Sequence, residues 1–182
     1  MEFYQQIKLK DGRDCVLRSA GESDGAAVLE NYLRTHAETD FLLSYPDEND
    51  KTAEQEARFL QKKLESPDEA EIVALVEGRI VGSAGIDRIG TREKVRHRAS
   101  FGISVERAYW GLGIGRALTR ACIECAGRAG YVQLELEVAA DNERAAALYQ
   151  SEGFAEYGRN PKGFRSRRCG WQEVVLMRRE LV

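Results

Sequence analysis

Three glycines at alternating positions, set between a strand-like run and a helix-like run, constrain the fold of this chain more than any other feature. Residues 104–119 read SVERAYWGLGIGRALT. The first turn of a helix has unpaired N–H groups and the positive end of the helix dipole, and glycines let a phosphate approach that backbone. The pattern therefore predicts an anion site formed by the backbone of Gly111, Leu112, Gly113, Ile114, Gly115 and Arg116.

The spacing of these glycines excludes two common nucleotide sites. The dinucleotide fingerprint requires a further glycine three residues after Gly113, where this chain has Arg116. The phosphate loop of nucleoside triphosphatases requires Gly-Lys-Ser/Thr, and the segment GIGRAL has neither lysine nor a hydroxyl residue. The remaining pattern is G-x-G-x-G between a mid-chain strand and a helix.

The spacing of apolar residues predicts a mixed α/β fold in one domain, residues 1–182. Strand patterns occur at about residues 15–18, 71–76, 80–86, 99–105, 131–138 and 172–181. Helical spacing follows a cap at Asp24, a capping box of Thr52 with Gln55, the glycine stretch, and Asn142. Residues 158–171, GRNPKGFRSRRCGW, are predicted to be a basic loop.

Composition excludes several classes of protein. The net charge of -3 provides no basic field for a nucleic acid. We find no apolar run of about 18 residues that would span a membrane, and the polar N-terminal stretch MEFYQQIKLKDGRD lacks a signal-peptide core. A cytoplasmic location is therefore expected. Cys122 and Cys125 lie in a helical pattern with alanines, which predicts small buried side chains and no metal site.

Four segments together resemble the GNAT acetyltransferase superfamily, over roughly residues 14–180. Two carry most of the likeness: FGISVERAYWGLGIGRALT is similar to the family's acetyl-CoA strand and loop, and LELEVAADNERAAALYQSEGF to its second signature. VLRSAGESDG resembles the opening strand and helix, and EVVLMRREL the closing strand. The resemblance implies a GNAT fold, with a central, twisted, mostly antiparallel sheet of about six or seven strands flanked by about four helices.

The resemblance also implies acetyl-CoA as co-substrate and a primary amine as acceptor. By match, the backbone of Ile103, Ser104 and Val105 would hold the pantetheine arm between two splayed strands, and an N–H near Ile103 would face the thioester oxygen. Tyr149 matches the family's tyrosine near the CoA sulfur and would protonate the departing thiolate. Asn142 would cap the short helix and contact the pantetheine amide.

One departure from the family pattern lies in the loop itself. The family often has arginine or glutamine at the position of Trp110, so this chain lacks one charge near the cofactor. Arg116 is the residue expected to supply that charge instead.

Two residues are candidates for the general base. Freeing a lysine-like amine at pH 7 costs about 4.6 kcal/mol, but freeing a peptide α-amine costs only about 1–1.4 kcal/mol. Glu137, on the polar face of the strand before Asn142, is the first candidate, with a solvated sheet residue as the alternative. His97 is the second, although it stands in the basic stretch REKVRHRAS, which is typical of a solvated surface.

The acceptor itself is not determined by the sequence. The acidic loop ETDFLLSYPDEND suits a cationic amine, whereas the late basic loop suits an acidic group. Three acceptors therefore stay open: a peptide amino terminus, a lysine side chain and a small amine. The sequence also leaves open whether the transferred acyl group is always acetyl. Two other functional classes are a non-catalytic acyl-CoA-binding sensor and a nucleic-acid module, which the net charge disfavours. A homodimer is suggested only by analogy with members of the family, which are often dimers.

Overall fold

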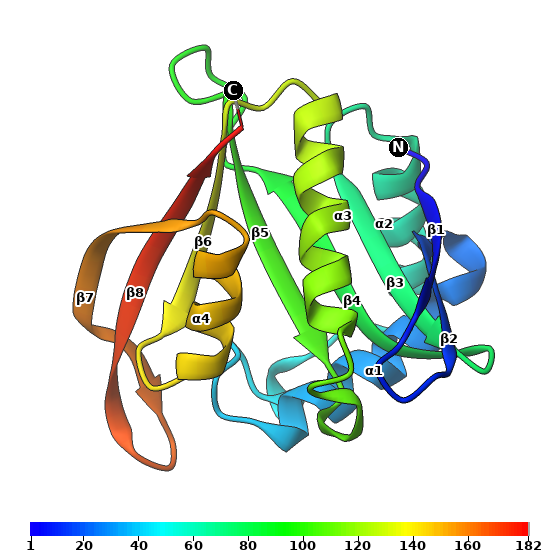
Figure 1. Ribbon diagram of the computed structural model, residues 1–182, viewed down its shortest axis with the longest axis horizontal. Coiled ribbons are helices and arrows are strands. Elements are labelled where there is room, and N and C mark those ends of the chain that lie inside the picture. Colours follow the sequence, from blue (N-terminus) through cyan, green and yellow to red (C-terminus); the bar gives the residue numbers. More distant parts are fainter. Residues whose placement is uncertain (182) are drawn as a thin grey trace.

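The computed structural model describes residues 1–181 and is built around one eight-stranded sheet (Figure 1). The strands run in the order β1-β2-β3-β4-β5-β6-β8-β7. Their bounds are β1 (Tyr4–Lys8), β2 (Asp14–Ser19), β3 (Ala70–Val76), β4 (Arg79–Arg88), β5 (Arg98–Val105), β6 (Gln133–Ala139), β7 (Ala155–Ser166) and β8 (Gly170–Glu180). Only β5 and β6 pair in parallel, which confirms the mostly antiparallel sheet.

Two of these strands were not predicted from the sequence. β1 lies in the polar N-terminal stretch, where the sequence predicts no strand, and β7 occupies much of the segment predicted to be a basic loop. Both lie at the edges of the sheet and expose most of their residues, so neither has the apolar alternation of a half-buried strand. The prediction of a loop over residues 158–171 is therefore wrong for all but the turn between β7 and β8.

Four α-helices cover the sheet: α1 (Gly25–Glu38), α2 (Ala53–Glu65), α3 (Ile114–Arg128) and α4 (Glu143–Ser151). α3 lies on one face, and α1 and α2 lie on the other (Figure 1). The capping box of α2 is confirmed, since Gln55 N donates to Thr52 Oγ1 and Thr52 N donates to Gln55 Oε1. Asp24 precedes α1 but does not cap it, because its carboxylate binds Arg18 at 2.7 Å through both oxygens.

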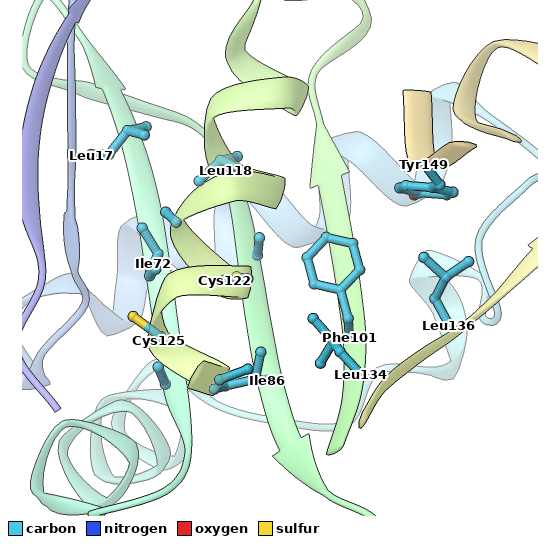
Figure 2. Close-up of a cluster of buried hydrophobic side chains, with 14 of the residues drawn as sticks. Leu17, Ile72, Ile86, Phe101, Leu118, Cys122, Cys125, Leu134, Leu136 and Tyr149 are labelled. Carbon is cyan, nitrogen blue, oxygen red and sulfur yellow. The ribbon is translucent and has the colours of Figure 1, made fainter. Parts of the chain in front are cut away.

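The main core lies between α3 and the central strands (Figure 2). Cys122 and Cys125 are buried there, and burial raises the pKa of the Cys125 thiol to about 11, so both act as small apolar side chains.

Among residues 1–181, no three His, Cys, Asp or Glu side chains are grouped to hold a metal ion. No helix in the same range has the length and apolarity to cross a membrane. That residues 1–182 form a single domain stays a prediction.

The parallel pair β5–β6 opens into a wedge. The two strands pair only where Arg98–Ser100 face Gln133–Glu135. Beyond that point β5 continues along β4 as far as Val105, whereas β6 continues along β8 as far as Ala139. The strands meet near the C-terminal end of the chain and diverge toward α4, as Figure 1 shows. The wedge therefore leaves one edge of each strand without a strand partner.

Candidate functional site

The loop that precedes α3 has the conformation that the glycine pattern implies. Gly111 has a φ of 84° and Gly113 a φ of 105°, both in the left-handed region that glycine adopts freely. Gly113 is the N-cap residue of α3, and no atom lies within 4 Å of where its Cβ would stand. The first-turn N–H groups of α3 therefore border open space, which suits an anion.

A cavity of about 410 Å³ lies against this loop, and we call it the loop cavity. It is bordered by α1 and the segment after it, the end of β5, the glycine loop and α4. The predicted residues that line it are Ile103, Ser104, Val105, Gly111, Gly113, Gly115, Arg116, Asn142 and Tyr149. The side chain of Ile114 is instead fully buried in the core, and Leu112 packs against that core. Backbone contacts remain the only role open to these two residues.

The carbonyl of Val105 already has a partner. The indole Nε1–H of Trp110 donates to Val105 O at 2.7 Å. Trp110 is the residue that departs from the family pattern, and its side chain closes the loop back onto the end of β5. One of the two lone pairs of the Val105 carbonyl, whose backbone the resemblance assigned to the pantetheine arm, is therefore used within the protein.

The charge expected from Arg116 is largely engaged elsewhere. Arg116 Nε lies 3.1 Å from Glu152 Oε1, and Arg116 Nη2 donates to Ser151 Oγ. Arg144 lies closer to the loop: its guanidinium stacks 5.4 Å from the Trp110 ring, and Nη2 lies 3.2 Å from where a Cβ on Gly111 would stand. Within residues 1–181, no carboxylate forms an ion pair with Arg144.

Sequence reasoning missed two cations of the loop cavity, Arg144 and Lys10. Arg144 stands inside the second signature, two residues after Asn142, so its position could have been noted. Lys10 had no sequence signal. It reaches the site because its backbone N–H donates to Leu112 O from the turn between β1 and β2.

A second cavity, of about 580 Å³, lies along the wedge between β5 and β6, and we call it the strand cavity. Most of its lining is aliphatic or aromatic, and its ionisable side chains include Arg98, Glu135 and Glu137. Five residues line both cavities, so the two spaces meet at Phe41, Leu42, Ile103, Asn142 and Tyr149.

Tyr149 stands at this junction. Its ring lies edge-on to Phe101 and to Phe154, with centroids 6.0 Å away in each case. Figure 2 shows it extending from α4 above Leu136 of β6. The side chain is 8% exposed, and its hydroxyl has no hydrogen-bond partner within residues 1–181. Burial raises the pKa of Tyr149 to about 12, so the phenol is neutral at pH 7.

The two candidate bases differ in position. Glu137 is exposed and lines the strand cavity. His97 lines neither cavity: it is exposed and precedes the opposite end of β5, six residues and roughly 20 Å from Ile103. The structure therefore brings Glu137 to the site and leaves His97 away from it. Asn142 caps α4 by accepting from Ala145 N at 3.3 Å.

The acidic and basic segments that pointed to opposite acceptors bind each other. Arg167 Nη1 lies 2.7 Å from Asp47 Oδ1, and its guanidinium lies 4.1 Å from the Tyr45 ring. Tyr45 Oη donates to Asp40 at 2.9 Å, and Ser166 donates to the same carboxylate. The charges of Asp47 and Arg167 are therefore paired within the protein, and Asp40 accepts hydrogen bonds from Tyr45 and Ser166, so these three residues are not free for an acceptor.

Comparison with known proteins identifies the family of this chain. The model of the acetyltransferase (GNAT) family matches residues 31–154. N-alpha-acetyltransferase RimI of Mycobacterium tuberculosis is 39% identical over 119 residues, which are 65% of this chain and 71% of that protein. L-amino acid N-acetyltransferase AaaT of Escherichia coli is 32% identical over 103 residues, 56% of this chain and 63% of that protein.

A solved structure extends the likeness to nearly the whole chain. The acetyltransferase of the GNAT family from Streptococcus pneumoniae has a TM-score of 0.87 at 30% identity, and the match covers 91% of this chain and 99% of that one. The family match and the shared fold thus indicate the same kind of protein. The chain belongs to the acetyltransferase (GNAT) family and is an acetyl-CoA-dependent N-acetyltransferase.

Proposed function

We propose that the chain transfers an acetyl group directly between its two cavities, with acetyl-CoA in the loop cavity and the amine in the strand cavity. The observation that carries the proposal is that Ile103, Asn142 and Tyr149 line both spaces. A donor and an acceptor bound on either side would therefore meet at one phenol and one strand backbone. Holding two reactants in this way removes much of the entropic cost of a bimolecular step.

The loop cavity fits the phosphates of the donor. The open space beside Gly113 and the first-turn amides of α3 would accept the pyrophosphate. Arg144 and Lys10 would supply positive charge, since Arg116 is paired with Glu152. Bound acetyl-CoA supplies an activated acyl group, and the backbone N–H near Ile103 would stabilise the negative charge that develops on the thioester oxygen.

Two side chains would move the protons. Glu137 would accept a proton from the attacking amine, directly or through water. As the C–N bond forms and the C–S bond breaks, Tyr149 would donate its proton to the sulfur and regain one from solvent. A phenol with a pKa near 12 is a weak acid, but the same apolar surroundings also raise the pKa of a thiol formed beside it. The pKa difference between the phenol and the thiol is therefore smaller than it would be for a thiol in water.

Amine-dependent release of CoA thiol tests the proposed function. Purified protein with acetyl-CoA is screened against peptides, polyamines, aminoglycosides and amino-acid derivatives. We expect at least one class of amine to raise thiol release well above hydrolysis. Thiol release that no amine raises, with acetyl-CoA binding intact, would favour a non-catalytic acyl-CoA-binding protein.

Replacing Arg144 by alanine is expected to raise the KM for acetyl-CoA by about 10- to 100-fold, with a small change in kcat. A charge-assisted hydrogen bond contributes about 1.5–3 kcal/mol, and this one would be equal in the ground and transition states. Initial rates over a range of acetyl-CoA concentrations measure it. Arg107→Ala is the matched control, because Arg107 stacks 5.9 Å from the same Trp110 ring but does not line the loop cavity. Equal effects of both substitutions would contradict the role of Arg144.

Replacing Glu137 by glutamine is expected to slow transfer to amines of high pKa more than to α-amines. Deprotonation at pH 7 costs a lysine-like amine about 3 kcal/mol more than a peptide α-amine, so a placed base matters more for the former. The measurement is kcat/KM for a matched pair of acceptors from pH 6 to pH 10. Glu124→Gln, an exposed position on α3, is the control. An equal loss for both acceptors would remove Glu137 from proton transfer.

We also propose that the chain acts in the cytoplasm and does not bind nucleic acid. Supporting the second point, Arg159 pairs with Glu156 and Glu173, and Arg167 pairs with Asp47, so these two cations of the late basic segment are neutralised. A homodimer remains a proposal by analogy, and light scattering on the purified protein tests it.

A further inference from the structure

The strand cavity has one cation among its described lining residues, and that cation is committed. Arg98 forms a two-point ion pair with Glu135, in which Arg98 Nη2 lies 2.7 Å from Glu135 Oε2 and Arg98 Nε donates to Oε1. Gln133 Nε2 donates to the same carboxylate at 3.1 Å, and Tyr157 Oη lies 3.4 Å from it. The planar guanidinium therefore has its fork filled by a carboxylate of the protein.

The rest of the lining is mostly apolar, with neutral polar side chains such as Ser100 and Asn142 and, among the described residues, one carboxylate outside an ion pair. Within residues 1–181, Glu137 forms no ion pair. Around the opening, Leu43 is 81% exposed and Ile89 is 40% exposed, and Phe164 borders the same space. Large exposed apolar side chains gathered at one opening mark a surface that a ligand covers.

We propose that the acceptor is a primary amine that carries an apolar group and has no free carboxylate beside the amine. The inference rests on the proposed function and specifies its acceptor. A ligand carboxylate in this cavity would lose water, meet Glu137 and Glu135, and find Arg98 already paired. An ammonium would meet Glu137, and an apolar group would cover Leu43, Ile89 and Phe164. An amino terminus of a polypeptide and a free apolar amine share this chemistry.

Four small acceptors separate the effects of charge, basicity and apolar size. L-Leucine carries the carboxylate; L-leucinol replaces it with a neutral hydroxymethyl group and keeps an amine of similar basicity; glycinamide lacks the apolar side chain of L-leucinamide. We expect kcat/KM for leucinol to exceed that for leucine by at least 30-fold, and leucinamide to exceed glycinamide by about 10-fold. A leucine-initiated tetrapeptide amide then compares the two sources: a further gain over leucinamide identifies a polypeptide, and equality identifies a small amine.

A variant of Glu135 tests whether this residue excludes acceptors that carry a carboxylate. Glu135→Gln keeps the shape and frees the guanidinium of Arg98, so the ratio of leucine to leucinol activity is expected to rise at least tenfold. Glu156→Gln is the matched control, because it breaks a similar pair with Arg159 outside both cavities. Thermal unfolding checks that each variant is folded, and the comparison of acceptors on the unaltered protein does not depend on either.

The outcomes distinguish this inference from the proposed function. Leucine accepted as well as leucinol by the unaltered protein would overturn the inference and leave the acetyltransferase intact. An unchanged ratio in folded Glu135→Gln would remove the Arg98–Glu135 pair as its cause. Absence of thiol release with every amine would instead count against the proposed function.

Discussion

Replacing Tyr149 by phenylalanine is expected to lower kcat by about 100- to 1,000-fold and to leave the affinity for acetyl-CoA nearly unchanged. A placed general acid contributes about 10²- to 10⁴-fold, and the hydroxyl is the only part of the side chain removed. The ring packing against Phe101 and Phe154 is kept. Steady-state rates give kcat, and calorimetry with acetyl-CoA gives the affinity.

Tyr131→Phe is the matched control for this experiment. Tyr131 is also buried, its hydroxyl has no hydrogen-bond partner in the described part of the chain, and it lines neither cavity. The same chemical change there should leave kcat unaltered. In the unaltered enzyme, the pKa near 12 keeps the Tyr149 phenol protonated. Deprotonation of Tyr149 should therefore cause no decline in kcat below about pH 11. Full activity of Tyr149→Phe across this range would exclude the general acid.

Replacing Lys63 by methionine is expected to lower the free energy of unfolding by about 3–5 kcal/mol at pH 8. Lys63 is buried between α2 and the sheet, where Nζ lies 3.1 Å from Glu71 Oε2 and 2.8 Å from Asp87 Oδ1. Removing one partner of a buried ion pair leaves an uncompensated charge. Urea unfolding gives the value. Lys8→Met is the matched control, because the exposed pair of Lys8 with Asp14 contributes about 0–1 kcal/mol.

The loss in Lys63→Met should depend on pH with a definite sign. Burial raises the pKa of Glu71 above its ordinary value, and Lys63 opposes that rise. Without Lys63 the folded protein takes up a proton at Glu71 that the unfolded chain does not hold. Stability then falls as pH rises above the unfolded pKa of about 4.3, so the loss is smaller at pH 5 than at pH 8. Adding Glu71→Gln should restore much of the stability at pH 8, and an equal loss at both pH values would contradict this account.

The sequence predicted the elements with strong apolar patterns and missed those without them. The hairpin of β3 and β4 was found because its strands are apolar and its turn has Glu77 and Gly78 at positive φ. β1 and β7 were missed because an edge strand exposed on most of its residues has the composition of a loop. Only pairing with β2 and β8 makes them strands.

The two cavities likewise combine features that local sequence patterns predict with features that only the fold shows. The glycine loop, the cap at Asn142 and the place of Tyr149 in the second signature are local patterns, and Gly111, Gly113, Gly115, Asn142 and Tyr149 line the loop cavity. The acidic and basic segments indicated opposite acceptors, but Asp47 and Arg167 of these segments pair with each other in the folded protein. Asp47 and Arg167 are 120 residues apart in sequence, so no local pattern shows that they pair.

By itself, the sequence determined the backbone of the glycine loop, which we propose as the donor site, because φ angles at Gly111 and Gly113 and the cap of a helix depend on neighbouring residues. Only the tertiary structure decided which charges are free. Arg98 and Glu135 are 37 residues apart and neutralise each other across β5 and β6, while Arg144, over the glycine loop, forms no ion pair within residues 1–181. The physical reason is that Coulomb attraction depends on distance in space, which the fold sets and the sequence alone does not show.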